Sequence, residues 1–371
     1  MNIIQFVPRL PPAIDGVGDY ALNLACQLRQ DFGIKTHFIV SDPTWTGATH
    51  IEGFPVRKVT VHSADTLLSL LPSDRAATVL LHYVGYGYAK RGCPVWLADG
   101  LQRWRTASTH RTIVTMFHEV YASGRPPWTS AFWLFPLQRN LASQLVQLSD
   151  RCLTSKQGYG DILTYLSQGK HTSIPCLPVF SNIGEPERVL PLTERQRQLV
   201  VFGGREKRLR VYQNSWSILS HTCQHLEIEQ ILDIGTPTQL SLSTIDHVPI
   251  MEMGQQSAKE ISSILSNSLV GFFDYPTDFL AKSTIFAAYC AHGVLPVSAQ
   301  CTALPVDGIA PGKHYWFPDK QTTDLKSVTQ MQAIANNAYN WYQTHNLSVQ
   351  AKTFATQLTA LSQPKFRNNN S

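Results

Sequence analysis

Short apolar runs alternate with longer segments of helical period along almost the whole chain. The run NIIQFV, at residues 2–7, precedes a segment with Leu22, Ala25 and Leu28 on one helical face and Gly33 as its stop. Four further apolar runs follow: KTHFIVS, ATVLLHYV, RTIVTMFHE and RCLTS. Because this alternation is typical of parallel sheets covered by helices, the chain is predicted to be α/β, with doubly wound parallel sheets.

A second series of the same alternation begins after a loop at residues 181–191 that is rich in proline. The chain of 371 residues also exceeds what one hydrophobic core usually organises. We therefore predict an N-terminal domain at 1–185, a C-terminal domain at 186–345, and a last helix within 346–371 that could cross back to the N-terminal domain before a frayed tail. In the second series, LRVYQNSWSILSHTCQHL is predicted as one helix, and a late helix is expected around residues 324–344.

The amino-acid composition indicates a folded globular protein and limits the kinds of partner it could bind. With 43% hydrophobic and 15% charged residues, the chain can bury two cores and is not of the disordered class. A net charge of +5 without a long Lys/Arg run suits acidic small molecules or an anionic membrane surface and gives no nucleic-acid signature. The seven cysteines show no metal or redox spacing, and no apolar run approaches the roughly 20 residues of a membrane helix. The expected location is the cytoplasm, with peripheral contact at the inner face of a membrane left open.

The loop after the first predicted strand carries Gly16, Val17 and Gly18. Glycines at this place allow the backbone to approach a ligand closely. The dinucleotide fingerprint is not met, because its third glycine position falls on Ala21. Two interpretations stay open: a loop that faces a ligand, and a turn that needs glycine.

His118 and Glu119 end the apolar run RTIVTMFHE, where an α/β protein displays side chains toward its ligand. A histidine at this place could donate to a sugar hydroxyl or stabilise a developing charge. The alternative is a histidine at the edge of the core whose ring binds a backbone carbonyl.

Two helix starts in the second series have features of anion sites. The run QLVVFGG leads into Gly203, Gly204 and Arg205, and Arg210 follows five residues after Arg205. Guanidinium groups at the mouth of a strand suit a diphosphate, whereas the plainer interpretation is a solvated basic helix start.

The second of these helix starts is at Lys282 and Ser283, after the run LVGFFDY. An ammonium group beside helix N–H groups also makes an anion site. The alternative here is a serine cap beside a solvated lysine.

Taken together and in order, these motifs resemble those of the family 4 glycosyltransferases. GVGDYALNLACQLR resembles the family's N-terminal glycine loop and helix, and VFGGREKRLR resembles its Gly-Arg…Lys phosphate loop. FAAYCAHGVLPV resembles the family's glutamate-bearing helix and the glycine–x–proline–valine strand after it. The resemblance spans nearly the whole chain and implies two Rossmann-like domains facing a central cleft, an arrangement called the B type or GT-B.

By this resemblance the chain is expected to be a hexosyltransferase-like enzyme that moves a sugar from a nucleoside-diphosphate sugar with retention and needs no metal. UDP is the expected nucleotide, and the acceptor is an unknown glycan, lipid or small molecule. His118 is expected to face the donor sugar, and the Gly16–Gly18 loop to face the diphosphate or the acceptor. The residues expected to hold the diphosphate are Gly203, Gly204, Arg205, Arg210, Lys282 and Ser283.

The chain also departs from the family's pattern. The family carries two glutamates separated by seven residues, where this chain has Leu280 and Ala288, and Asp15 replaces the first glycine of the N-terminal loop. Ribose or sugar hydroxyls would need other partners, and the nearest carboxylates are Asp274, Asp278 and Glu119. These departures keep two alternatives open: a nucleotide-sugar-binding or scaffold protein without catalysis, and a nucleotide-sugar epimerase of the same fold.

Overall fold

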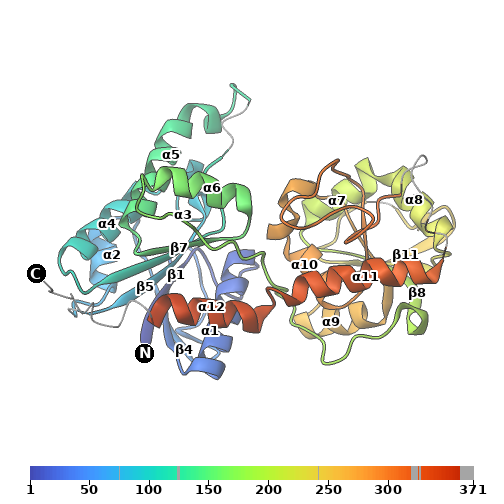
Figure 1. Cartoon of the computed structure of the whole chain (residues 1–371), viewed down its shortest axis with the longest axis horizontal. Coiled ribbons are helices and arrows are strands. Elements are labelled where there is room, and N and C mark those ends of the chain that lie inside the picture. Colours follow the sequence, from blue (N-terminus) through green and yellow to red (C-terminus); the bar gives the residue numbers. More distant parts are fainter. Residues whose placement is uncertain (75, 123–125, 241, 319–324, 326, 360–371) are drawn as a thin grey trace, which may run out of the picture. The chain divides into compact units, whose positions relative to one another are not determined.

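The computed structural model describes residues 1–371 apart from 75, 123–125, 241, 319–324, 326 and 360–371 (Figure 1). The chain forms two compact units, one of Met1–Leu177 with Leu347–Ser371 and one of Pro178–Asn346. The sequence placed these divisions after residues 185 and 345.

The N-terminal unit is built on a seven-stranded sheet with the order β3-β4-β2-β1-β5-β6-β7, in which only the edge pair β3–β4 is antiparallel. Every position of β5 is buried, so protein covers both faces of the sheet at its centre. The strands are β1 (Asn2–Val7), β2 (Lys35–Val40), β3 (His50–Ile51), β4 (Phe54–Lys58), β5 (Thr78–Tyr83), β6 (Thr112–Phe117) and β7 (Arg151–Thr154).

Helices of the N-terminal unit connect these strands and cover the sheet (Figure 1). They are α1 (Gly16–Phe32), α2 (Ala64–Leu70), α3 (Gly85–Tyr88), α4 (Val95–Thr106), α5 (Ser130–Leu148), α6 (Gln157–Leu166) and the C-terminal α12 (Leu347–Thr359), with a 3-10 turn η1 (Lys90–Gly92). The C-terminal helix α12 packs on α1, and the Tyr20 hydroxyl donates to Gln350 Oε1 at 2.5 Å. The last described helix is therefore part of the N-terminal unit.

The C-terminal unit is built on a six-stranded sheet with the order β10-β11-β9-β8-β12-β13, again with one antiparallel edge pair, β10–β11. Its strands are β8 (Gln196–Phe202), β9 (Gln230–Ile234), β10 (Thr244–Ile245), β11 (Val248–Gly254), β12 (Ser268–Phe273) and β13 (Leu295–Ser298). Its helices are α7 (Arg205–Asn214), α8 (Trp216–His225), α9 (Ala258–Asn267), α10 (Thr284–Ala291) and α11 (Val328–Gln343), with 3-10 turns η2 (Leu192–Glu194) and η3 (Thr277–Lys282).

One predicted helix is wrong, because the segment LRVYQNSWSILSHTCQHL is divided between α7 and α8 at Ser215. Ser215 has φ −120° and ψ 20°, and its hydroxyl donates to Asp274 Oδ2 at 3.1 Å. Serine competes with helical hydrogen bonding through its side chain, and here a tertiary partner takes that side chain. The expected start of the late helix, at residue 324, lies outside the described residues, and its described part is α11.

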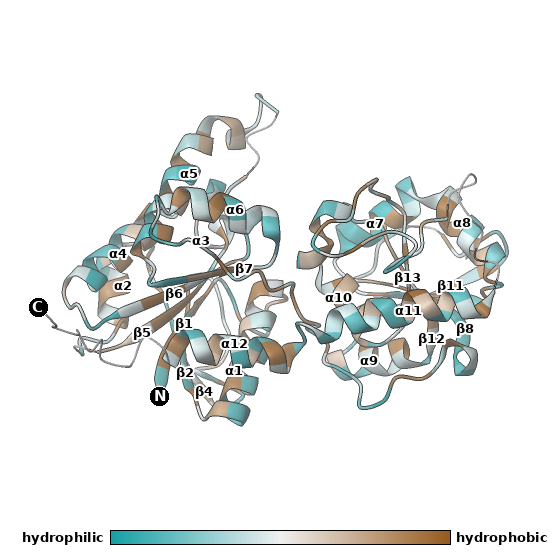
Figure 2. Ribbon diagram, in the orientation of Figure 1, coloured by the Kyte–Doolittle hydropathy of each residue, from teal (hydrophilic) through white to brown (hydrophobic). Residues whose placement is uncertain are grey.

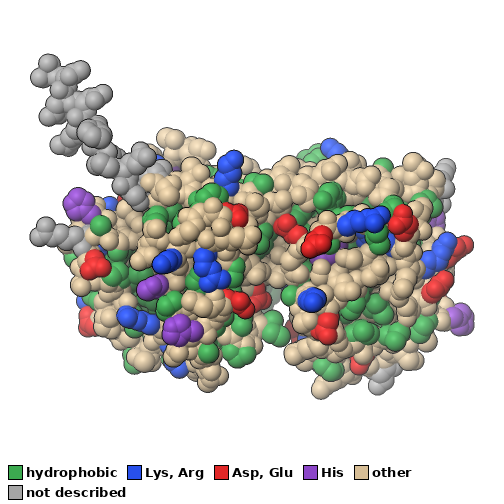
Figure 3. All heavy atoms as spheres, turned by 90° about the horizontal axis from the view of Figure 1, so that it is seen from below, with side chains coloured by type: hydrophobic (Ala, Val, Ile, Leu, Met, Phe, Trp, Pro, Cys, Tyr) green, Lys and Arg blue, Asp and Glu red, His purple; other side chains and the backbone are tan. Residues whose placement is uncertain are grey.

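The surface of the two units is mixed in charge, and their strands are apolar. Figure 2 shows brown, apolar residues along the strands and teal, polar residues on the outer faces of several helices. On the face drawn in Figure 3, Lys and Arg side chains are interspersed with Asp and Glu. Within the described residues, none of the helices combines the length and apolar character that crossing a membrane requires.

Candidate functional site

Three cations gather near the carboxyl ends of β8 and β12 in the C-terminal unit. Protein atoms around Lys207, and then the charges of Lys282 and Arg210, lower the pKa of Lys207. The Lys207 Nζ lies 5.0 Å from the ring centroid of Tyr275, which follows β12, and so is held over that ring. The repulsion that Lys207 experiences from Lys282 and Arg210 favours a bound anion, because an anion removes it.

The approach to this cluster depends on two glycines between β8 and α7. Gly203 has φ +127°, and a Cβ there would lie 2.6 Å from Ile285 Cδ1, so the position requires glycine. Gly204 is the N-cap of α7, and no heavy atom outside its immediate neighbours lies within 4 Å of the place where its Cβ would be. The N–H groups of Arg205 and Glu206, in the first turn of α7, have no acceptor within the helix.

Arg205 turns toward a different neighbour from the cations around Lys207. One of its terminal nitrogens donates to the Thr238 carbonyl at 3.0 Å, and the other contacts Glu206 Oε1 at 3.2 Å. The structure therefore brings together Arg210 and Lys282 from the predicted set and adds Lys207, which the sequence did not single out. The signal was available, since Lys207 and Arg210 lie three apart in α7 and share a helical face.

Arg208 anchors the glycine loop from inside the unit. Its side chain is fully buried, pairs with the Asp233 carboxylate, and donates to the Gly203 carbonyl at 3.0 Å. The other Asp233 oxygen accepts from the Tyr212 hydroxyl at 2.7 Å. A buried ion pair with these extra hydrogen bonds fixes the loop in one conformation.

Asp274, a predicted ribose contact, is engaged within the protein. It is only 6% exposed, and its Oδ1 accepts from Gln300 Nε2 at 2.5 Å and from Arg210 at 3.4 Å. Its Oδ2 accepts from Ser215. Asp274 thus orients Arg210 within the cation cluster, and a ribose hydroxyl would have to share these oxygens.

The start of α10 forms the other side of the cation cluster. Ser283 caps the helix, accepting from the Phe286 N–H at 3.2 Å, and the N–H groups of Thr284 and Ile285 have no acceptor within the helix. The hollow between α7, β12 and α10 encloses only about 10 Å³, so a diphosphate would lie at its mouth.

The two positions where the resembled family has glutamates are apolar and closed to solvent. Leu280 and Ala288 are each 1% exposed, and every residue from Ile285 to Ala291 is buried. No carboxylate could be added there without burying its charge. Asp278, in η3, is exposed, and its predicted role as a ribose contact stays a prediction.

In the N-terminal unit, Asp15 takes the place of the family's first loop glycine and has a capping role. Its Oδ1 accepts from the N–H groups of Val17 and Gly18 at 3.0 Å each, and its Oδ2 lies 3.4 Å from Arg9 Nε. A Cβ on Gly18 would lie 2.0 Å from the Arg9 carbonyl oxygen. Gly18 is thus required for close packing, and a ligand at this loop would compete with the Asp15 carboxylate. A ligand contact at Gly16, Val17 and Gly18 stays a prediction.

His118 belongs to a chain of buried polar side chains that crosses the sheet of the N-terminal unit. Its Nε2 lies 3.2 Å from His82 Nδ1, and His82 Nε2 lies 2.9 Å from Gln5 Oε1. Gln5 Nε2 in turn donates to Thr36 Oγ1 at 3.3 Å. The ring of Tyr20 packs edge-on against His118, with centroids 5.0 Å apart.

The hydrogen-bond chain assigns the protons. Burial lowers the pKa of His82 to about 3, so that ring is neutral at physiological pH. Because Gln5 Oε1 can only accept, His82 carries its proton on Nε2 and accepts through Nδ1. His118 must then donate from Nε2, and in its neutral form Nδ1 is its accepting nitrogen. Glu119 follows it, and its N–H lies 3.4 Å from the Tyr83 carbonyl oxygen.

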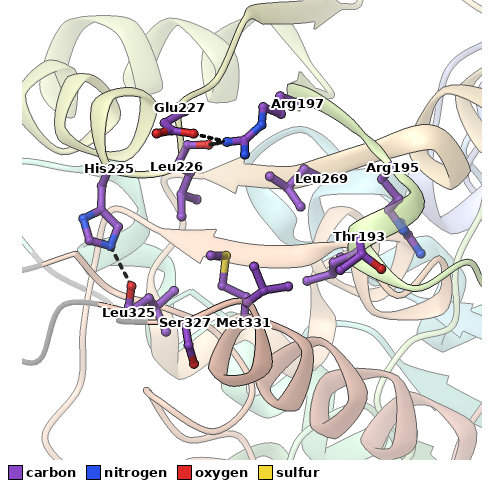
Figure 4. Close-up of a pocket in the computed structure, with 12 residues that line it drawn as sticks. Thr193, Arg195, Arg197, His225, Leu226, Glu227, Leu269, Leu325, Ser327 and Met331 are labelled. Atoms are coloured by element: carbon purple, nitrogen blue, oxygen red, sulfur yellow. Dashed lines mark hydrogen bonds and ion pairs between the residues drawn. The ribbon is translucent and has the colours of Figure 1, made fainter.

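A larger cavity of about 470 Å³ lies at the other end of the C-terminal sheet (Figure 4). Its polar side chains are used internally: Arg197 pairs with Glu227 at 2.7 Å, and His225 Nε2 donates to the Leu325 carbonyl at 2.9 Å. Arg195 donates to the carbonyls of Leu190, Leu265, Ser268 and His292. Ligands of open α/β sheets bind beyond the carboxyl ends of the strands, whereas this cavity lies at their amino ends. We therefore do not assign it as the ligand site.

Comparisons with known proteins agree on the architecture. No protein-family profile and no curated protein matches the sequence. An alpha-glucosyltransferase solved with UDP and a 13-mer DNA containing an HMU base superposes with a TM-score of 0.58 at 11% identity, over 98% of this chain and 100% of that one. The pneumococcal O-GlcNAc transferase GtfA, solved with UDP and GlcNAc, gives 0.58 at 9% identity over 98% and 99%.

A putative UDP-N-acetylglucosamine 2-epimerase from Listeria monocytogenes gives a TM-score of 0.57 at 11% identity, over 97% of this chain and 96% of that chain. At such identities the likeness concerns the fold and leaves the activity open. The chain has the GT-B fold, with a mostly parallel sheet and flanking helices in each of its two units.

Proposed function

We propose that this chain is a glycosyltransferase that moves a sugar from a nucleoside-diphosphate sugar to an acceptor, with retention and without a metal ion. The observation that carries the proposal is the cation cluster of Lys207, Arg210 and Lys282 beside the N-termini of α7 and α10. The resemblance to family 4 glycosyltransferases supports the same assignment from the sequence.

The cluster has the chemistry that a leaving diphosphate needs. Charge builds on the diphosphate as the bond to the sugar breaks, and fixed cations with helix N–H groups stabilise that charge. Each charge-assisted hydrogen bond contributes about 1.5–3 kcal/mol. Three ammonium or guanidinium groups would thus take the role that a metal ion has in other sugar transferases.

His118 is proposed to contact the donor sugar. The contact is proposed from the position of His118 directly after β6, where its Nε2 also donates to His82 Nδ1 at 3.2 Å. A histidine at such a position can hydrogen-bond a sugar hydroxyl or stabilise a developing charge.

Binding and turnover require separate experiments. Calorimetric titration with UDP, GDP, ADP and their sugar conjugates tests the diphosphate site, and UDP comes first because two of the compared structures were solved with it. Release of UDP from UDP-sugars, with and without a chelator, then tests turnover and the role of metal. The anomeric configuration of the product, read by NMR, tests retention.

A nucleotide-sugar-binding protein without catalysis is the second candidate. The specific observation in its favour is that Leu280 and Ala288 are buried apolar residues at the positions of the family's paired glutamates. Tight binding of a UDP-sugar with no UDP release and no epimerised sugar would select this candidate. Formation of an epimer with the nucleotide still attached would select the epimerase.

The acceptor is left as a glycan, lipid or small molecule. The DNA in the compared alpha-glucosyltransferase structure is a ligand of that protein. We do not extend it to this chain, because a net charge of +5 over 371 residues without a long basic run is a weak footprint for nucleic acid.

A further inference from the structure

The N-terminal turns of α5 expose an unusual number of large apolar side chains. Between Ser130 and Leu137 none of the residues is buried, and the first buried residue of the helix is Gln138. In Figure 1 these turns project beyond the rest of the N-terminal unit, and Figure 2 shows apolar residues on them. The aromatic ridge is defined as Trp128 (84% exposed), Phe132 (40%), Trp133 (74%) and Leu137 (38%).

The ridge is held in place by the protein beneath it. Gln138 Nε2 donates to the Arg91 carbonyl at 2.8 Å, and Gln138 Oε1 accepts from the Ala122 N–H at 3.0 Å. The Thr129 hydroxyl caps the helix, and Phe135 packs edge-on against Tyr121 with centroids 5.2 Å apart. The exposure of the ridge is therefore a property of a capped and anchored helix, whose other half enters the core.

Basic side chains lie on and beside the helix that carries the ridge. Residues 126–149 contain Arg139 and no aspartate or glutamate. Lys90 and Arg91 are exposed in η1, the turn that Gln138 joins to α5, and Arg139 is exposed one residue further along the helix. The Arg139 guanidinium lies 5.7 Å from the ring centroid of Tyr165, which is itself 72% exposed.

We propose that the aromatic ridge docks this protein on an anionic lipid bilayer. Tryptophan prefers the interface between headgroups and acyl chains, and flanking Lys and Arg bind anionic headgroups. The ridge therefore lies in the interface, while Lys90, Arg91 and Arg139 contact the lipid phosphates. A second copy of the chain fits less well, because pairing two such ridges would bring their like charges together.

The test is sedimentation of the full chain with vesicles of phosphatidylcholine alone or mixed equally with phosphatidylglycerol. The wild type should bind the anionic vesicles, and binding should weaken in high salt. The double variant Trp128→Ser/Trp133→Ser should lower the partition coefficient by about tenfold or more, since two interfacial aromatic side chains are lost. Trp216→Ser, at a 38% exposed tryptophan of the C-terminal unit, is the matched control and should bind as the wild type does.

Three outcomes would overturn the proposal. The wild type could stay in the supernatant with both kinds of vesicle, or the double variant could bind as tightly as the wild type. Analytical ultracentrifugation without lipid could also show a wild-type dimer that the double variant converts to a monomer, which would make a second copy the occupant. The unfolding temperature of each variant is measured as a control. A value equal to that of the wild type shows that the comparison is between folded proteins.

Discussion

Replacing Lys207 by methionine should weaken diphosphate binding and leave the unliganded protein at least as stable as the wild type. The methionine keeps an apolar chain over the Tyr275 ring and removes only the charge. One charge-assisted contact contributes about 1.5–3 kcal/mol, which corresponds to a loss of UDP affinity of roughly 10- to 150-fold. Lys207→Met is therefore expected to lose about as much UDP affinity as variants that remove the charge of Arg210 or Lys282.

The stability of the unliganded protein should change in the opposite direction. The pKa of Lys207 is lowered in the folded protein, so its charged form is disfavoured there relative to the unfolded chain. Removing the charge ends its desolvation by the surrounding protein and the repulsion with Lys282 and Arg210. The unfolding temperature without ligand should hold or rise, while the increase caused by UDP should shrink.

Calorimetry and thermal unfolding with and without UDP measure both effects. Lys259→Met, at an exposed lysine of α9, is the matched control and should change neither quantity. Arg205→Gln should lose less affinity than Lys207→Met, because Arg205 first has to leave the Thr238 carbonyl. Equal UDP affinity for the wild type and the Lys207 variant would refute the assignment of the cation cluster.

The remaining predictions concern His118, the glycine loop, the cap of α1 and pH. His82→Phe removes the acceptor for the His118 proton and should lower turnover about tenfold with little change in UDP affinity. His82→Asn should keep part of the lost turnover, because its Oδ1 can accept that proton. Equal turnover in the two variants would favour a purely structural role for His82. Arg208→Met should cost about 3–5 kcal/mol in urea unfolding, because it leaves Asp233 buried and unpaired. Asp15→Ala should cost about 0.5–2 kcal/mol by the same assay, and a change below that range would argue against its capping role. Burial lowers the pKa of His82 to about 3 and that of His292 to about 4, so the unfolded chain takes up their protons first. The free energy of unfolding should therefore fall as the pH drops below about 6.5, and His82→Phe should flatten this slope in urea titrations.

The α/β class and most core elements could be predicted from the sequence because their apolar runs are buried on both faces. The run NIIQFV matches β1, and Gly33 ends α1 in a left-handed conformation with φ 62°, as its position predicts. Edge strands such as β3 and β10 span two residues each and have no periodicity to detect. The division of α7 from α8 depends on the bond from Ser215 to Asp274, 59 residues away, which no local pattern contains.

The sequence predicted the kind of site, a cationic site for a diphosphate, but only some of the residues that form it. Arg210 and Lys282 were singled out, whereas Lys207 was passed over, although its spacing from Arg210 places both on one face of α7. His82 lies in the middle of an apolar strand and has the pattern of a core residue, so its contact with His118 could only come from the pairing of β5 with β6. Asp15 could have been recognised as an N-cap, because aspartate before a helix start is a strong capping signal.

Binding of a nucleoside diphosphate at the cluster of Lys207, Arg210 and Lys282 is tested most directly by the pKa of Lys207 itself. Protein labelled with ¹⁵N at the lysine Nζ positions, with Lys207→Met used to assign the signal, can be titrated by NMR with and without saturating UDP. We expect a pKa below the ordinary lysine value without ligand and a rise when UDP binds, since the diphosphate cancels the repulsion from Lys282 and Arg210. A Lys207 pKa that is the same in both titrations, with UDP shown to be bound, would contradict this expectation.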